Sequence, residues 1–206
     1  GFKVSGPSVL RPPKNPCTLC DGTRCLKGRP DCTVPHILYL ALFGKIVKVG
    51  VTKEKRYERR IREQGAPFAT KISRHEDGMK ARRAEKALAS GEGLRMGVRF
   101  EEKVNSIGRV CDVSQANRLI SRMPLPNGLE LDDMRCLYQN PDLESPSRPI
   151  ILRGDVVRGK IEDTRGEALL LTYKDNLYAY DLRRSIGRIL TLGGAKIKTQ
   201  LTLGNF

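Results

Sequence analysis

Two short apolar runs, separated by a Gly-Lys break, form the most patterned stretch of the chain. The first run covers residues 36–43 (HILYLALF) and the second covers residues 46–52, with Gly44 and Lys45 between them. In the second run, three valines alternate with a mixed set of residues: Val47, Val49 and Val51 against Ile46, Lys48 and Gly50. Alternation on both sides of a glycine-containing break predicts a β-hairpin, with an apolar face and a face that carries Lys48.

A charged segment follows the hairpin and has the features of a short helix. Residues 53–67 read KEKRYERRIREQGAP, and a glycine followed by a proline is a signal that ends a helix. A β-like run over residues 68–73 then leads to a second helical segment over residues 77–89. The order strand, strand, helix, strand, helix predicts a compact α+β core, which we place within residues 36–122.

Composition divides the rest of the chain into four further parts. Residues 1–16 are basic and rich in proline, which predicts an extended arm, and residues 17–35 form a loop rich in cysteine. Residues 123–149 contain several prolines and are interpreted as a linker. Residues 150–206 hold five short β-like runs separated by turn residues, which predicts a small antiparallel β-barrel or sandwich.

The charge of the chain is strongly positive and unevenly distributed. The formal net charge is +15, and residues 1–120 hold 25 Lys and Arg against 12 Asp and Glu, whereas residues 121–206 hold 13 against 11. Basic side chains gathered in one part favour a polyanionic partner, since each neutralised phosphate releases bound counterions. Nucleic acid is therefore the expected partner, and a merely basic surface or another anion is the alternative.

The same composition argues against a membrane protein. No run of 18 or more apolar residues exists in the sequence, so no membrane span is expected. The first residues, GFKVSGPSVLRPPKNP, contain no apolar segment of the kind found in signal peptides. We expect a cytoplasmic protein whose core rests on Leu, Ile and Val, because tryptophan is absent.

Four closely spaced cysteines indicate a metal site. They follow the pattern Cys-x2-Cys-x4-Cys-x6-Cys and are Cys17, Cys20, Cys25 and Cys32. Four thiolates within 16 residues suit a structural, tetrahedral Zn²⁺, while a disulfide pair and an iron–sulfur cluster remain alternatives. His36 is a possible replacement for one of these cysteines. Cys111 and Cys136 stand alone and are assigned to core packing.

Two triplets in the hairpin resemble a known nuclease superfamily. Ile37-Leu38-Tyr39 and Lys48-Val49-Gly50 stand where the GIY-YIG nucleases carry the triplets that name them, in the variant whose second triplet begins with lysine. Cysteine pairs followed by PHILYLALFG, VKVGVT, RRIREQGA and a glutamate-bearing helix are more similar still to an uncharacterised prokaryotic family of unknown function. The resemblance covers residues 15–90 well and residues 150–190 more faintly. It implies a small GIY-YIG-like sheet with helices.

The resemblance also implies a set of site residues around one divalent metal ion. Tyr39 takes the tyrosine position of the first triplet, Arg60 the arginine of the first helix, and Glu85 the metal-binding glutamate. Lys48 replaces the second tyrosine, and a lysine there would stabilise phosphate charge or lower the pKa of a neighbour. In the purely structural interpretation, Tyr39 is an ordinary strand aromatic and Glu85 pairs with Arg82 or Lys86 on its own helix.

These observations lead to one expected function and two alternatives. Ten basic residues are expected to contact nucleic acid: Lys14, Arg24, Lys27, Arg29, Arg56, Arg59, Arg60, Arg62, Arg82 and Arg83. We expect a zinc-containing protein that binds structured RNA, such as ribosomal RNA, and that associates with ribosomes. The alternatives are a Mg²⁺-dependent endonuclease of the GIY-YIG type and a zinc-scaffolded protein–protein adaptor, whose RNA binding would be weak and insensitive to salt.

Overall fold

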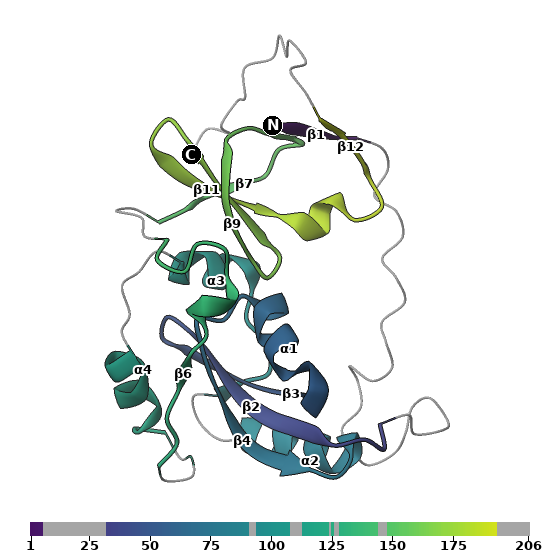
Figure 1. Cartoon of the computed structure of the whole chain (residues 1–206), viewed down its shortest axis with the longest axis vertical. Helices are drawn as coiled ribbons and strands as arrows, with labels where there is room; N and C mark the ends of the chain where they lie inside the picture. Colours follow the sequence, from purple (N-terminus) through teal and green to yellow (C-terminus); the bar gives the residue numbers. More distant parts are fainter. Residues whose placement is uncertain are drawn as a thin grey trace.

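The chain folds into a mixed α+β structure with two parts (Figure 1). The computed structural model describes residues 1–5, 32–90, 94–107, 113–123, 125, 128–143 and 148–192, without the side chains of residues 115, 190 and 192. A five-stranded sheet with helices forms the lower part in Figure 1, and most of the later strands form the upper part. We call these parts the core domain and the β-rich module.

The predicted hairpin is confirmed. Strands β2 (His36–Phe43) and β3 (Ile46–Lys53) pair antiparallel along their full length. Gly44 begins the turn between them with a φ of 60°, in the left-handed region that glycine tolerates. The register places Tyr39 opposite Gly50 and Ala41 opposite Lys48.

The hairpin lies in the middle of the five-stranded sheet, whose order is β5-β3-β2-β4-β6. Strand β4 (Phe68–His75) pairs antiparallel with β2, and β6 (Asp132–Asp133) extends the same edge. The short strand β5 (Leu94–Arg95) runs parallel to β3 at the other edge. The two triplets that the sequence singles out therefore lie on neighbouring strands inside the sheet.

Both predicted helices of the core domain are confirmed, with the predicted ends. After the 3-10 turn η2 (Glu54–Arg56), helix α1 (Tyr57–Gln64) ends at Gly65, whose φ of 77° closes the last turn. Helix α2 (Gly78–Ala89) begins after Asp77, whose side chain accepts a 2.8 Å hydrogen bond from the amide of Lys80.

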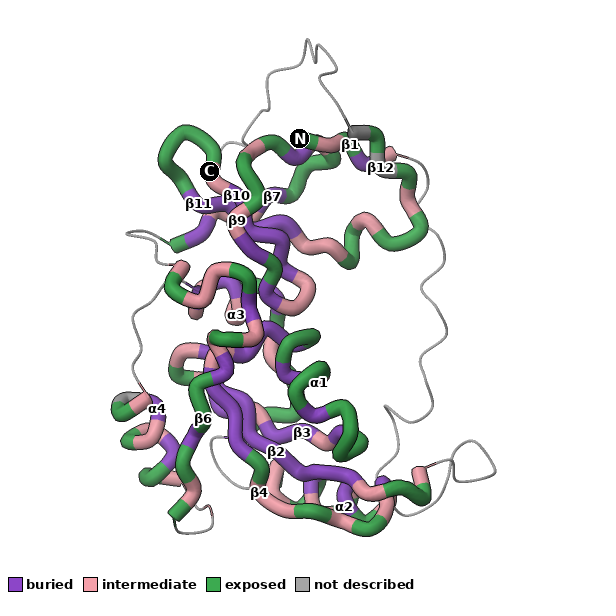
Figure 2. The backbone as a smooth tube through the Cα atoms, viewed as in Figure 1, coloured by how far each residue is buried: buried purple, intermediate pink, exposed green. Residues whose placement is uncertain are grey.

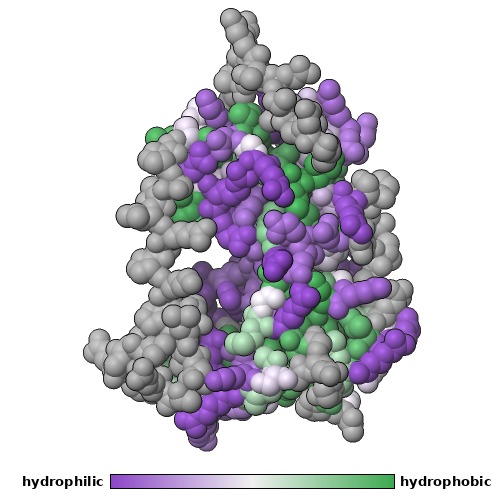
Figure 3. Space-filling model, turned by 180° about the vertical axis from the view of Figure 1, so that it is seen from behind, coloured by the Kyte–Doolittle hydropathy of each residue, from purple (hydrophilic) through white to green (hydrophobic). Residues whose placement is uncertain are grey.

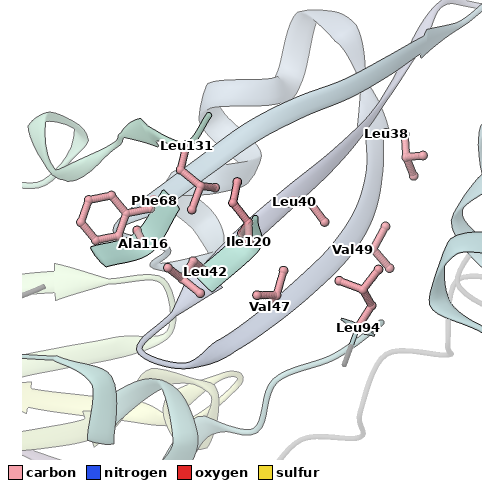
Figure 4. Packing of buried hydrophobic residues seen from close by; sticks show 10 residues of the cluster. All are labelled: Leu38, Leu40, Leu42, Val47, Val49, Phe68, Leu94, Ala116, Ile120 and Leu131. Atoms are coloured by element: carbon pink, nitrogen blue, oxygen red, sulfur yellow. The ribbon is translucent and has the colours of Figure 1, made fainter. Parts of the chain in front are cut away.

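Helices cover both faces of this sheet. Helix α4 (Val113–Ile120) packs with part of α2 against one face, which we call the leucine face (Figure 4). Its buried side chains are Leu38, Leu40, Leu42, Val47, Val49, Phe68, Leu94, Ala116, Ile120 and Leu131. Helix α1 packs against the opposite face, which we call the tyrosine face, through Tyr57 and Ile61. Figure 2 shows β2 buried along its length while α1 alternates between buried and exposed positions.

The sequence predicts a small antiparallel barrel or sandwich, and the β-rich module contains two sheets, neither of which closes into a barrel. A four-stranded sheet has the order β7-β11-β10-β9, made of β7 (Ile150–Leu152), β9 (Lys160–Arg165), β10 (Ala168–Tyr173) and β11 (Asn176–Asp181). Its pairing is not purely antiparallel, because β7 runs parallel to β11. A parallel pair needs a long connection, and residues 153–175 supply it, which periodicity alone does not reveal.

A three-stranded sheet joins distant parts of the sequence. Strand β1 (Phe2–Ser5) pairs with β12 (Ile189–Leu192) and β8 (Val156–Val157), although the sequence places its residues in an extended arm. The buried Val4 belongs to the same hydrophobic cluster as Leu171 and Tyr180 of the four-stranded sheet. The 3-10 turn η4 (Leu182–Ser185) connects β11 to β12.

Helix α3 (Phe100–Ser106) and the 3-10 turn η3 (Arg135–Leu137) lie where the core domain meets the β-rich module. Phe100 and Val104 of α3 pack in one cluster with Leu170 of the β-rich module.

The surface seen in Figure 3 is hydrophilic over much of the described residues, with hydrophobic side chains showing between the polar ones. Among the described residues, no helix has the length and apolar character needed to cross a membrane.

Candidate functional site

The hydroxyl of Tyr39 marks the centre of a polar cluster within the tyrosine face. Tyr39 is 1% exposed, and its ring packs edge-on against Tyr57 with ring centres 5.9 Å apart. A Cβ atom built on Gly50 would lie 2.5 Å from the Tyr39 hydroxyl oxygen, far inside a normal contact distance. The glycine of the second triplet is therefore the residue that lets the tyrosine of the first triplet lie across strand β3.

Gln64 connects Tyr39 to Lys48. Its Nε2 donates a 2.6 Å hydrogen bond to the Tyr39 hydroxyl, and its Oε1 accepts a 3.2 Å hydrogen bond from Lys48 Nζ. Sequence reasoning missed this residue. Tyr57, Ile61 and Gln64 are the buried positions of α1, so their helical spacing was the signal that could have found it.

Lys48 is a partly buried cation with a neutral hydrogen-bond partner. Burial, together with the nearby positive charge of Arg60, lowers the pKa of Lys48 to about 8, while the negative charge of Glu85 opposes the change. Its Nζ lies 5.6 Å from the centre of the Tyr39 ring, a cation–π arrangement. Among the described residues, no carboxylate forms an ion pair with Lys48, so an incoming anion would gain a direct partner.

Arg60 reaches the same place from the first helix. Burial raises the pKa of Tyr39, while the charge of Arg60 and hydrogen bonds from Gln64 and Arg60 work in the opposite direction. The phenol therefore stays protonated at neutral pH and its oxygen accepts hydrogen bonds from the neighbouring N–H groups. Arg60 also lies 3.6 Å from a carboxylate oxygen of Glu63.

Glu85 joins the cluster from helix α2. It is 3% exposed, and Arg82 donates a 2.6 Å hydrogen bond to its Oε2. Its negative charge raises the pKa of Lys48, so the carboxylate lies within electrostatic reach of the cluster. The structure thus brings together Tyr39, Lys48, Arg60 and Glu85, the four residues that the sequence proposes for a site, from four different elements. Arg82 is engaged with this carboxylate instead of lying open on the surface.

The basic residues of the first helical segment surround a single carboxylate. Glu63 accepts hydrogen bonds from Arg59 at 2.9 Å and from Arg56 at 3.1 Å, and it also pairs with Arg60. Three of the arginines expected to contact nucleic acid are therefore partly neutralised within the protein. Because one carboxylate neutralises at most one of three guanidinium groups, the surface keeps a positive excess. Arg62 and Arg83 are also exposed.

Cys32 and His36 lie against the first residue of helix α2. A Cβ atom built on Gly78 would be 2.7 Å from Cys32 Cβ and 3.0 Å from His36 Nε2. The other ring nitrogen, His36 Nδ1, is 2.7 Å from the carbonyl oxygen of Val34, and burial lowers the pKa of His36, which favours a neutral ring. A backbone carbonyl on one nitrogen is the usual arrangement of a zinc-binding histidine, and thiolate and imidazole are ligands that zinc prefers.

The other predicted ligands and several predicted contacts lie outside the described residues. The ligands are Cys17, Cys20 and Cys25, and the contacts are Lys14, Arg24, Lys27 and Arg29. Cys111, which the sequence assigns to core packing, also lies outside the described residues. Among the residues that are described, no three His, Cys, Asp or Glu side chains gather into a metal site. Cys136 is exposed, which corrects its assignment to core packing.

Comparison with known proteins gives one match. Residues 8–123 match a family described as "Protein of unknown function (DUF2797)". The matched segment includes four of the five strands of the core sheet, β2 to β5, and both helices that carry the cluster. It also includes the four cysteines near the N-terminus. No curated protein and no solved structure matches the chain.

Proposed function

The chain belongs to the DUF2797 family of proteins of unknown function, and for this member we propose a zinc-containing protein that binds structured RNA. The observation that carries the proposal is the cluster of Tyr39, Lys48 and Arg60. A partly desolvated ammonium, a phenol and a guanidinium are all hydrogen-bond donors suited to the oxygens of a phosphate. Among the described residues no carboxylate pairs with Lys48, and the anion would supply this missing charge partner.

The surface around the cluster supports a long anionic ligand instead of a small one. Arg56 from the turn η2 and Arg59 and Arg60 from helix α1 lie around the single carboxylate of Glu63. Such a surface contacts several phosphates at once, and contact with each phosphate adds to the salt dependence of binding. RNA is proposed over DNA because the described helices include no long recognition helix that would enter the major groove of duplex DNA.

Zinc is proposed as a structural component next to this site. Cys32 and His36 both face the N-terminal end of helix α2, which carries Glu85 and Arg82. A metal ion held there with the nearby cysteines would fix the start of α2 relative to strand β2. Metal analysis of the purified protein is expected to give one zinc per chain, and His36→Ala or Cys32→Ser is expected to lower that content.

Association with ribosomes is the proposed setting, and a sucrose gradient of cell extract tests it. The protein is expected to sediment with ribosomal particles and to move to the top of the gradient after RNase treatment. Sedimentation as a small free protein in both gradients would remove the ribosomal part of the proposal. A purified protein that binds RNA only weakly, and equally at low and high salt, would instead support the protein–protein adaptor.

A Mg²⁺-dependent endonuclease of the GIY-YIG type is the second candidate. The convergence of Tyr39, Lys48, Arg60 and Glu85 favours it, since the resemblance assigns catalytic roles to these positions. The site fits Mg²⁺ poorly, however, because the Glu85 carboxylate is already paired with Arg82 at 2.6 Å. Mg²⁺ also relies on at least one available carboxylate besides water and substrate oxygens.

A cleavage assay separates the two candidates. Labelled structured RNA and DNA are incubated with the wild-type protein and with Glu85→Gln, each with and without Mg²⁺. The binding proposal predicts intact nucleic acid in all samples and similar affinity for both proteins. Mg²⁺-dependent cleavage by the wild type that disappears in Glu85→Gln would make the endonuclease the better description.

A further inference from the structure

The Gln64 amide has one possible orientation, and this orientation fixes the proton of Tyr39. A lysine ammonium has three donors and no acceptor, so the group of Gln64 that faces Lys48 must be the Oε1 oxygen. The Nε2 group must then face Tyr39 and donate to its hydroxyl oxygen. The Tyr39 O–H is therefore directed away from Gln64 and can donate to a ligand.

The backbone of Gln64 is held by the β-rich module. Gly65 and Gly166 both have left-handed backbone conformations, with φ of 77° and 60°. A Cβ atom on Gly166 would lie 2.7 Å from the carbonyl carbon of Gln64, and one on Gly65 would lie 2.7 Å from the carbonyl carbon of Arg165. The turn between β9 and β10 therefore contacts the end of helix α1 backbone to backbone, a distance that only glycine permits.

Buried polar contacts hold this turn in place. Arg165 donates to Asp163 at 2.9 Å and to the carbonyl oxygen of Asn140 at 2.7 Å, and its guanidinium stacks over Tyr138. The Tyr138 hydroxyl in turn donates to the carbonyl oxygen of Ala66 at 2.8 Å, two residues beyond Gln64. Because these groups are buried and mutually bonded, the turn has little freedom to move relative to α1.

The same turn also contacts the other side of the cluster. Glu167 accepts 3.0 Å hydrogen bonds from Lys103 of helix α3, and both side chains are largely buried. Lys103 lies close enough for its charge to lower the pKa of Lys48. One turn of the β-rich module thus touches the cluster through the backbone of Gln64 and through Lys103.

We propose that Gln64 is a positioning residue for the Tyr39–Lys48 pair, and that the β9–β10 turn holds Gln64 in place. The β-rich module would then complete the candidate site, although its strands carry none of the residues that face the ligand. The use of this device in RNA binding rests on the proposed function. The positioning itself does not, because it can be measured on the protein alone.

The test is an NMR titration of Lys48 in the full chain without nucleic acid, assigned with a Lys48→Arg variant. Gln64→Leu removes the acceptor while keeping the site closed, so the midpoint of Lys48 is expected to fall by about one pH unit. Gln64→Glu places a carboxylate at the same position, so the midpoint is expected to rise. Opposite shifts from two variants of similar size distinguish positioning from a general loss of structure.

The contribution of the turn is tested with Gly166→Asn, since asparagine tolerates a left-handed φ but adds a Cβ against Gln64. This change is expected to move the Lys48 midpoint in the wild-type background and to have no effect in the Gln64→Leu background. Gly128→Asn is the matched control, because Gly128 has a φ of 77° with nothing within 4 Å of the added Cβ. It should leave the midpoint unchanged.

Two results would overturn the proposal. One is an unchanged Lys48 midpoint in both Gln64 variants, and the other is an equal effect of Gly166→Asn in the two backgrounds. If Gly166→Asn does not fold, the Lys48 midpoint is measured for Arg165→Lys in the same two backgrounds. Lysine keeps the charge at position 165 but loses the paired contacts with Asp163 and Asn140. If the titrations behave as expected but no RNA binds, the proposed function fails and the positioning role stands.

Discussion

The two faces of the five-stranded sheet come from the same strands but have opposite characters. On the leucine face, alternate residues of β2 such as Leu40 meet Val49 and Ile120 in a hydrophobic cluster (Figure 4). On the tyrosine face, the buried Tyr39 and the partly buried Lys48 share a glutamine as their hydrogen-bond partner. Burial of the side chains on the leucine face stabilises the folded state. Removal of the Lys48 cation from water on the tyrosine face destabilises it.

This difference indicates which face carries function. A partly buried ammonium without an ion pair lowers the stability of the folded chain, so stability alone would favour an apolar residue at position 48. The chain instead places Lys48 in contact with Gln64 and near Arg60, a second positive charge. In our account, an anionic ligand offsets the unfavourable free energy of this arrangement when it binds.

The largest expected effect is on the leucine face. Leu40→Ala removes a fully buried side chain and leaves a cavity, so the free energy of unfolding should fall by about 2–5 kcal/mol. Urea denaturation monitored by circular dichroism measures this change. A loss below about 1 kcal/mol would mean that this face is less tightly packed than the structure indicates.

The second prediction has the opposite sign and concerns the tyrosine face. Lys48→Met replaces the partly buried ammonium with an apolar side chain of similar length, so the free energy of unfolding at pH 7 should rise by roughly 1–3 kcal/mol. Lys45→Met is the matched control, because Lys45 is exposed in the hairpin turn and its loss changes the net charge equally. A stabilisation of the same size in both variants would trace the effect to net charge and not to burial.

The third prediction is a pH dependence with a defined sign. The pKa of Lys48 is about 8 in the folded protein and has its ordinary value of 10.5 when the chain unfolds. Between these values the unfolded chain binds more protons, so the folded state gains stability as the pH rises, by at most about 1.4 kcal/mol per pH unit. Comparing wild type with Lys48→Met between pH 8 and pH 10 isolates this contribution, and identical slopes would contradict it.

The smallest effect on stability is expected on the exposed face of helix α1. The side chain of Arg59 is 68% exposed, so Arg59→Ala should change the free energy of unfolding by less than about 0.5 kcal/mol. If Arg59 contacts a phosphate, the slope of log affinity for RNA against log salt should become less steep by about one. Lys160→Ala, in an exposed ion pair of the β-rich module, should leave that slope unchanged.

Local signals in the sequence predicted much of the core domain. The hairpin, the end of α1 at Gly65 and the start of α2 after Asp77 depend on neighbouring residues, and the structure confirms each of them. The positions of Tyr39 and Glu85 near one another came from the resemblance and not from periodicity. Contacts set by sequence neighbours can be predicted from a single chain because alternation, caps and glycine turns leave direct traces in the sequence.

Contacts between distant segments were not predictable in this way. The pairing of β1 with β12 joins the two ends of the described chain, and the parallel pairing of β7 with β11 depends on the whole module. In the sequence, Gln64 is one of several polar residues in a charged helix. Its role depends on the contact of its backbone with Gly166 and of its side chain with Tyr39, both of which are distant in the sequence. The exposure of Cys136 likewise depends on which distant segments pack around it, and the local sequence does not show this.

The most direct test of the account is a titration of structured RNA, such as a ribosomal RNA fragment, at several salt concentrations. Wild type, Lys48→Met and the control Lys45→Met are compared by fluorescence anisotropy. The account predicts that Lys48→Met binds at least about tenfold more weakly, as expected for the loss of a charge-assisted contact worth about 1.4 kcal/mol or more, while Lys45→Met stays close to wild type. Equal affinity of all three proteins would contradict the claim that the buried cluster binds a phosphate.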